Sequence, residues 1–237
     1  MGNKIILPYF TRLGDNLQFS TLPRRFSELG HKVYVSSRIK CSSAEIYGLV
    51  WGVNPFVLGL SDEEPNAGDG ALIKYSNTTG NFIKNWEVGH GLAPKSERPE
   101  LYYLPNNIKS VNDKILIDVS CSSLKDDYNA DDLRKYITEH YDKAESVIAV
   151  FGDGISFPIL FLDGYDVVFV KDIYYYCDLI YSCGLYVCLH SGGNSLASAL
   201  QEHGKKDVEC LLSKCPKLFS ADASKLYMYD NIKYIWL

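Results

Sequence analysis

A short apolar run that passes through two glycines into a helix-forming run constrains this fold most. Residues 186–189 are Tyr, Val, Cys and Leu, with no charge and no helix or strand breaker, as in a buried strand. Gly192 and Gly193 follow, and the Leu- and Ala-rich run at 196–200 favours a helix. A buried strand that turns directly into a helix is the building unit of a parallel α/β sheet.

The start of this helix is a candidate anion site. The first amides of a helix lack partners within the helix, and its dipole favours negative charge there. Gly192 and Gly193 let the backbone approach a ligand with no Cβ in the way, and Asn194 or Ser195 is expected to cap the helix. The alternative is a plain strand–turn–helix connection without a ligand, because this short sequence is a common one.

The same alternation of strand and helix occurs twice along the chain. Strands are expected at 4–10 and 32–36, separated by a turn at 11–16 and a helical segment that Gly30 ends. After a region rich in turn residues at 61–112, with one helix at about 81–87, further elements are expected at 114–120, 131–144, 146–151, 166–170, 172–182 and 206–212. The pattern predicts an α/β fold with two Rossmann-like parallel-sheet domains facing a cleft, at residues 1–112 and 113–237.

Charge and composition exclude some classes of protein. The chain has 237 residues and a formal net charge of −5, which argues against a nucleic-acid or anionic-membrane surface. No apolar run reaches the roughly 18 residues of a membrane helix, and the N-terminus lacks the shape of a signal peptide. We therefore expect a cytoplasmic protein whose seven cysteines are reduced thiols: Cys41, Cys121, Cys177, Cys183, Cys188, Cys210 and Cys215.

Two motifs, one in each half, match a known family. Gly14 and Asp15 follow the first strand, and Thr21 and Pro23 come next; the run at 191–200 is the second motif. Together they resemble the heptosyltransferase-type glycosyltransferases (glycosyltransferase family 9), which have the two-domain GT-B fold. That family reads Gly-Asp then Thr-x-Pro, and later Asp-Ser-Gly-x-x-His-Leu-Ala-Ala-Ala-Leu.

The chain departs from the family's pattern at several points. His190 stands where the family has Asp, Ser195 stands where it has His, and Pro23 lies two residues further on. The chain is also shorter than is usual for such enzymes, so the resemblance describes a small member, reduced in size.

The resemblance implies an inverting, metal-independent glycosyltransferase without a cofactor. It would move a sugar from a nucleotide-diphosphate sugar, held by residues 113–237, to an acceptor hydroxyl, held by residues 1–112. Asp15 would be the base that takes the proton from that hydroxyl, and a carboxylate at the end of a strand suits this role. The residues alone leave open whether Asp15 is this base or caps the helix that follows.

The nucleotide-sugar site is expected to combine polar residues that follow the strands of the second half: Ser122, Ser123, Lys125, Asp153, His190, Ser191, Gly192, Gly193, Asn194 and Ser195. Some of them have other interpretations. Lys125 is also typical of a solvated surface lysine, His190 of a buried histidine with satisfied ring nitrogens, and Asp153 of a simple turn. The five histidines have no metal-ligand spacing with cysteines or acids, so we expect no metal.

Two rival functions fit the same residues. One is a sugar-nucleotide epimerase with a related fold, which would have no site for a second substrate in its first domain. The other is a module that binds a nucleotide or a glycan without catalysis, which the small size and the departures at His190 and Ser195 favour.

Overall fold

The computed structural model describes residues 2–8, 12–38, 43–66, 81–121, 128–152, 164–204, 207–213 and 228–237. The chain divides into two compact units. The first comprises Met1–Tyr103 with Lys225–Tyr229, and the second comprises Leu104–Ser224 with Asp230–Leu237. The main division thus comes after Tyr103, earlier than the expected 112.

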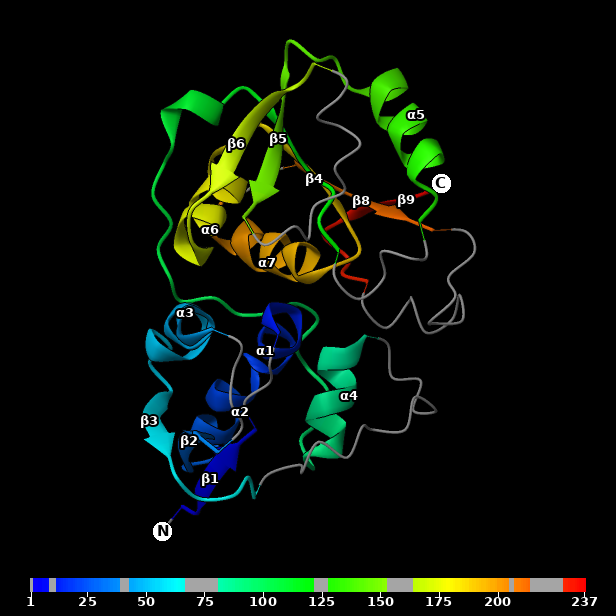
Figure 1. Cartoon of the computed structure of the whole chain (residues 1–237). Coiled ribbons are helices and arrows are strands. Elements are labelled where there is room, and N and C mark those ends of the chain that lie inside the picture. The colour runs from blue at the N-terminus through cyan, green and yellow to red at the C-terminus, as the bar shows by residue number, and fades with distance from the viewer. Residues whose placement is uncertain are drawn as a thin grey trace. The chain divides into compact units, whose positions relative to one another are not determined.

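The first unit is built on a small parallel sheet, shown in the blue to cyan part of Figure 1. Its strands lie in the order β1-β2-β3, and both pairs are parallel. The predicted strand at 32–36 is confirmed. The one predicted at 4–10 is found at Lys4–Leu7: Pro8 lies outside it, and positions 9 and 10 lie outside the described residues. In chain order the elements are β1 (Lys4–Leu7), α1 (Leu13–Phe19), α2 (Leu22–Glu28), β2 (Lys32–Ser36), α3 (Ala44–Tyr47), a π-helical turn (Gly48–Gly52), β3 (Val57–Ser61) and α4 (Phe82–Gly89).

The turn expected at 11–16 is wrong from residue 13 onward, because α1 begins at Leu13. Asn16, fully buried, accepts a hydrogen bond from the indole nitrogen of Trp51 at 2.9 Å and donates one to the Arg12 carbonyl at 2.7 Å. This long-range contact stabilises a helix that the local sequence, with Gly14 and Asp15, does not favour. Pro23 lies in the first turn of α2, where the missing N–H has no helical partner to lose.

The second unit contains a larger sheet in which every neighbouring pair is parallel, with the strand order β6-β5-β4-β7-β8-β9. An element is found at each place predicted from residue 114 onward, and the C-terminal tail forms a strand (Figure 1). The element at 206–212, for which the sequence allows a strand or a short helix, is a strand, and the helix predicted at 131–144 already ends at His140. The elements are β4 (Ile115–Asp118), α5 (Ala130–His140), β5 (Ser146–Phe151), β6 (Asp166–Val170), α6 (Ile173–Ser182), β7 (Leu185–Leu189), α7 (Gly192–Leu200), β8 (Asp207–Leu212) and β9 (Lys233–Trp236).

The order of these six strands reverses direction between β4 and β7. Counted along the chain they lie as 3-2-1-4-5-6, the order of doubly wound nucleotide-binding sheets. In such sheets ligands bind beyond the carboxyl ends of the strands at the point of reversal. The ends of β4 and β7, and the start of α7, are therefore the place to look for a site.

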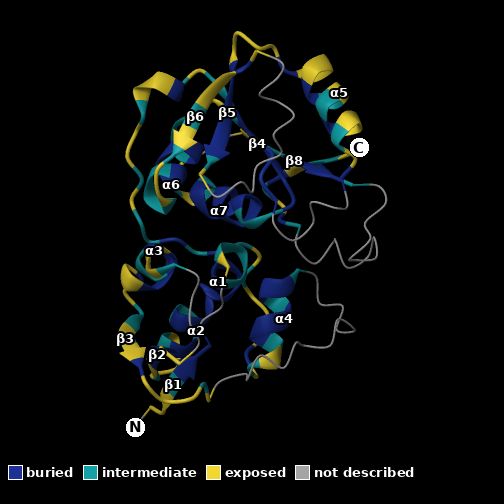
Figure 2. Ribbon diagram, in the orientation of Figure 1, coloured by how far each residue is buried: buried dark blue, intermediate teal, exposed yellow. Residues whose placement is uncertain are grey.

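Helices cover both faces of this sheet. Ile117, Val187 and Leu189 belong to a core cluster with Leu133 and Ile137 of α5. Because side chains alternate along a strand, Leu116, Asp118, Tyr186 and Cys188 point to the opposite face, toward α6 and α7. Figure 2 shows the central strands β4 and β5 in dark blue and the edge strand β6 largely in yellow.

The cysteines of the described part of the chain are free thiols, as expected. Their side chains are all buried and all lie in the second unit: Cys121, Cys177, Cys183, Cys188 and Cys210. Cys41 and Cys215 lie outside the described residues. Within the described ranges, none of the helices has the length and apolar character needed to cross a membrane.

A buried carboxylate in the first unit holds a loop against two helices. Glu87 on α4 is fully buried and accepts hydrogen bonds from the amides of Lys95 (2.6 Å) and Ser96 (3.1 Å) and from the Ser96 hydroxyl (2.7 Å). The guanidinium Nε of Arg25 on α2 lies 3.4 Å from the same carboxylate. Glu87 therefore neutralises a largely buried cation and satisfies the loop's donors.

Replacing Glu87 with Ala is expected to lower the free energy of unfolding of the first unit by about 3 kcal/mol, because it leaves a buried cation and three donors unpaired. Chemical denaturation measures this difference. Glu64→Ala is the matched control, since the Glu64 side chain is 71% exposed in its ion pair with Arg38, and its effect should stay within about 0.5 kcal/mol. Equal losses in both variants would contradict the role given to Glu87.

Candidate functional site

The N-terminus of α7 lies at the point of strand reversal and is capped by Ser191. The Ser191 hydroxyl accepts a hydrogen bond from the Gly193 amide at 3.3 Å, and its carbonyl accepts one from the Asn194 amide at 3.1 Å. The expectation that Asn194 or Ser195 caps the helix is wrong. Both glycines have taken helical conformations without positive φ, so the helix begins earlier than their turn propensity suggests.

Two main-chain donors at this helix start remain available. Among the described residues, no acceptor is found for the amides of Ser191 and Gly192, and both residues are partly exposed. The helix that follows is nine residues long, so its dipole adds positive potential at the same place. Free amides and a helix dipole together are what an anionic group requires.

Gly193 has a different purpose from the one expected of it. A Cβ at this position would come within 2.3 Å of the Tyr176 hydroxyl, 2.4 Å of the Tyr186 hydroxyl and 3.2 Å of the Asp118 carboxylate. The missing side chain therefore makes room for buried oxygen atoms inside the unit. The expectation that Gly193 is glycine so that its backbone can approach a ligand is corrected accordingly.

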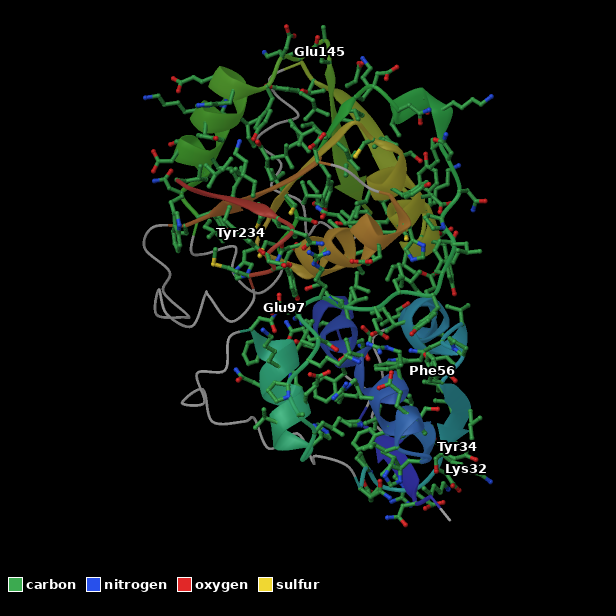
Figure 3. The ribbon with its side chains drawn as sticks, turned by 180° about the vertical axis from the view of Figure 1, so that it is seen from behind. Lys32, Tyr34, Phe56, Glu97, Glu145 and Tyr234 are labelled. Carbon is green, nitrogen blue, oxygen red and sulfur yellow. The ribbon has the colours of Figure 1, made fainter. Side chains whose placement is uncertain are left out.

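Asn194 and Ser195 lie within the first turns of the helix and are almost fully buried, at 1% and 3% exposure. The Asn194 side-chain oxygen accepts a hydrogen bond from the hydroxyl of Tyr234 at 3.4 Å. Tyr234, labelled in Figure 3, lies on β9. Asn194 thus ties α7 to the last strand, and donation by Asn194 or Ser195 to a phosphate stays a prediction.

His190 joins β7 to the capping residue and is 8% exposed. Its amide donates to the Tyr128 hydroxyl at 3.3 Å, and its carbonyl accepts a hydrogen bond from the Cys121 thiol at 3.7 Å. The same Tyr128 hydroxyl donates to the Leu211 carbonyl of β8 at 2.9 Å. The main chain before the α7 turn is therefore fixed by its neighbours, and a phosphate contact of the imidazole ring stays a prediction.

Four other predicted site residues lie outside the described residues: Ser122, Ser123, Lys125 and Asp153. The structure does describe where the chain enters their segments. β4 ends at Asp118 and β5 ends at Phe151, and both are parallel to β7. Both strands thus end at the carboxyl-terminal side of the sheet, where α7 begins.

A buried acid that the sequence analysis did not predict lies at this carboxyl-terminal side of the sheet. Asp118 is fully buried at the end of β4, and its carboxylate contacts the hydroxyls of Tyr176 on α6 and Tyr186 on β7. Its second oxygen accepts hydrogen bonds from the Ser120 amide, at 2.8 Å, and from the Ser120 hydroxyl. Burial raises the pKa of Asp118 against the opposing effect of these donors. A charged residue in the apolar run Ile-Leu-Ile-Asp-Val was the signal available for finding it.

Asp15 belongs to the first unit and is the third residue of α1. The helix is capped at Arg12, without a side-chain capping hydrogen bond, so the alternative that Asp15 caps this helix is wrong. Among the described residues none donates a hydrogen bond to its carboxylate. Burial raises the pKa of Asp15, and the nearby Arg12 lowers it by a smaller amount. A carboxylate with a raised pKa and available lone pairs is chemically suited to accept a proton.

Comparison with solved structures finds glycosyltransferases. A glycosyltransferase family 9 structure from Veillonella parvula is similar with a TM-score of 0.63 and 10% identity, covering 99% of this chain and 85% of that one. The ADP-heptose lipopolysaccharide heptosyltransferase II of Escherichia coli is similar with a TM-score of 0.58 and 12% identity, covering 99% and 90%.

A third similar structure is the iron-containing dodecameric glycosyltransferase TibC of enterotoxigenic E. coli, with a TM-score of 0.59 and 15% identity. The match covers 90% of this chain but spans only 57% of TibC. TibC has also been solved in complex with ADP-D-β-D-heptose. No protein-family model matches the chain. No curated protein matches it either. At these identities the comparisons establish the fold: two parallel-sheet units of the GT-B type, in a smaller chain.

Gly193→Ala is expected to destabilise the second unit by about 1–3 kcal/mol, because the added methyl group overlaps two hydroxyls that are held in a buried network. Thermal and chemical unfolding measure the loss. Gly152→Ala in the same unit is the control, because a Cβ there meets no atom within 4 Å, and its effect should stay within about 0.5 kcal/mol. A silent Gly193→Ala would show that the turn has room for a side chain.

Proposed function

We propose that this protein is a glycosyltransferase that moves a sugar from a nucleotide-diphosphate sugar to an acceptor hydroxyl, with inversion and without a metal ion. The observation that supports it most is the α7 N-terminus, with two available amides, at the strand reversal of a sheet like those of known glycosyltransferases. The second unit is then the donor unit and the first is the acceptor unit.

The donor part of the proposal follows from charge. A sugar nucleotide carries a diphosphate, and this group becomes the leaving group when the sugar is transferred. The amides of Ser191 and Gly192 and the dipole of α7 would stabilise the negative charge that develops on it. Because these donors belong to the main chain, the proposal needs no cation at the diphosphate. The ADP-heptose bound to TibC makes an adenine nucleotide the first ligand to test.

The acceptor part of the proposal rests on Asp15. Its carboxylate would take the proton from the acceptor hydroxyl while the hydroxyl oxygen bonds to the anomeric carbon of the donor. The bond from that carbon to the diphosphate breaks in the same step, and its electron pair leaves with the diphosphate. A single displacement of this kind inverts the configuration at the anomeric carbon. Burial raises the pKa of Asp15 toward the working pH, where a general base is most effective.

A non-catalytic nucleotide-binding module is the second candidate. It is favoured by the short length, because the chain spans 57% of TibC, and by His190 and Ser195 at the two changed motif positions. Incubation with a panel of nucleotide sugars separates the candidates. Nucleotide release supports a transferase, an isomerised sugar supports an epimerase, and binding without turnover supports the module.

A nucleoside diphosphate should stabilise the second unit in the presence of EDTA. At a ligand concentration about 100 times the dissociation constant, the gain in unfolding free energy is roughly 2.7 kcal/mol, and a thermal shift assay detects it. ADP is the first probe, followed by UDP, GDP and CDP. A shift that appears only with Mg²⁺ or Mn²⁺ would overturn the metal-free model, and no shift with any nucleotide would overturn the donor site.

Asp15→Asn should bind ADP like the parent and lose about 10²–10⁴-fold in turnover, because Asn has the same shape but cannot accept the proton. Initial rates of nucleotide release measure the loss. Asp62→Asn, at an exposed carboxylate of the same unit, is the control and should keep the parent's rate. Full activity in Asp15→Asn would end the assignment of Asp15 as the base.

The pH dependence of stability provides a second check on Asp15. Because the folded-state pKa is raised, the carboxyl group stabilises the fold fully only below its unfolded pKa of about 3.9, and this contribution is lost as pH rises through the folded pKa. The melting temperature of Asp15→Asn minus that of the parent should therefore increase as pH rises from 4 to 8. A constant difference across that range would contradict the burial of an ionisable Asp15.

A further inference from the structure

Asp118 lies directly beneath the first turn of α7. It is fully buried at the end of β4, where the strand order reverses. A Cβ built on Gly193 would lie 3.2 Å from its Oδ2 atom, so the carboxyl group and the helix start are in close contact. Any charge on Asp118 is therefore set against the same amides and the same dipole that would hold a diphosphate.

One carboxyl oxygen of Asp118 and two tyrosine hydroxyls form a triangle of hydrogen bonds. The number of contacts in it shows how many protons the three groups must share. Oδ2 of Asp118, the Tyr176 hydroxyl and the Tyr186 hydroxyl are all in mutual hydrogen-bonding contact, with 2.9 Å from Tyr186 to Oδ2 and 2.6 Å between the two hydroxyls. Three such contacts need three protons, because each short oxygen–oxygen contact holds one. The two tyrosines supply two, so the third belongs to Asp118.

The alternative, an ionised Asp118, satisfies this geometry less well. The two tyrosines would then supply two protons for three contacts, so one contact would hold none. If both hydroxyls donate to Oδ2, that contact is the 2.6 Å one between the hydroxyls. The other carboxyl oxygen fits a neutral acid equally, since the Ser120 amide and hydroxyl both donate to it. With one proton on Asp118, every contact of the cluster has one donor and one acceptor.

Within the described ranges, the groups that face Asp118 provide no positive charge. Tyr176 comes from α6, Tyr186 and Cys188 come from β7, and Gly193 comes from α7. Burial holds the pKa of both tyrosines and of Cys188 well above their ordinary values, so all three stay neutral. Cys210 of β8, the register partner of Cys188, is likewise a buried free thiol. Among the described residues, the hydrogen-bond partners of Asp118 are thus all neutral.

We propose that Asp118 is a neutral carboxylic acid whose proton, shared in a ring with Tyr176 and Tyr186, keeps the α7 N-terminus open to an anion. The inference rests on the proposed function, since the anion is the donor's diphosphate. Loss of this proton places a negative charge under the site, which repels the diphosphate and weakens its binding. Asp118 is then a positioning residue, which acts on the ligand through the helix start.

The sign of the pH effect follows from linkage. Burial raises the pKa of Asp118, and a bound diphosphate raises it further, so the protein takes up a proton on binding or keeps the one it has. Affinity falls as pH rises above the pKa of the free protein, with a limiting slope of about tenfold per pH unit for one proton. A diphosphate also titrates in this range, so the parent must be compared with a variant that lacks the acid.

The experiment measures the dissociation constant of ADP from pH 6 to pH 9 by calorimetry, for the parent and for Asp118→Asn. The ratio of the parent's constant to the variant's should increase with pH, because only the parent can ionise at this position. Glu87→Gln, at the buried carboxylate of the first unit, is the matched control, and its ADP affinity should follow the parent's pH profile. A parent-to-variant ratio that stays flat over the pH range in which the infrared band of the parent's carboxylic acid disappears would overturn the coupling.

Infrared difference spectroscopy between the parent and Asp118→Asn tests the protonation itself, with no nucleotide present. The parent should show a protonated carboxylic acid band at pH 7 that the variant lacks. A carboxylate band in its place, in a chain that binds ADP, would overturn this inference alone. No ADP binding in either protein would overturn the proposed function and the coupling with it, while the infrared band would still establish the state of Asp118.

Discussion

The parallel pairing of β4 with β7 is the constraint on which the second unit depends. Their register runs from Ile115 opposite Leu185 to Asp118 opposite Cys188. From this pair the sheet extends through β5 and β6 on one side and through β8 and β9 on the other. The connections therefore leave the carboxyl ends of the two strands in opposite directions. The α7 N-terminus and the buried Asp118 both lie at this edge because of that one pairing.

The turn at α7 is rigid for reasons that come from several elements. Ser191 caps it from within, and Tyr128 and Cys121 hold the main chain of His190 in front of it. Tyr176 and Tyr186 lie beneath Gly193. A turn fixed in this way holds its amides in place before any ligand arrives, so binding an anion costs little ordering of the chain.

Much of this architecture could be predicted from the sequence, because apolar, β-branched runs such as 146–151 and 185–189 form buried parallel strands wherever they occur. What could not be predicted depends on contacts between distant residues. The early start of α1 depends on the bond between Asn16 and Trp51, which are 35 positions apart. The purpose of Gly193 depends on Tyr176, Tyr186 and Asp118, which three different elements supply.

The candidate site, too, could be predicted from the sequence only in part. Local sequence predicted an anion site at 190–195 and a base at Asp15, because both follow strands, and both stay predictions. It assigned the helix cap to the wrong residues and did not single out Asp118. Capping depends on where a helix begins, and here two glycines in helical conformation moved that point. In the sequence Asp118 is a single acid in an apolar strand, and only its burial among hydroxyls in the structure distinguishes it.

The five buried thiols that the structure describes in the second unit can report on local opening of that unit. Cys188 and Cys210 are paired in register on neighbouring central strands, and Cys177 lies on α6. A thiol reagent reaches such side chains only when the packing around them opens. Their separate rates of modification thus record which parts of the sheet and its helices open alone and which open together, without any engineered probe.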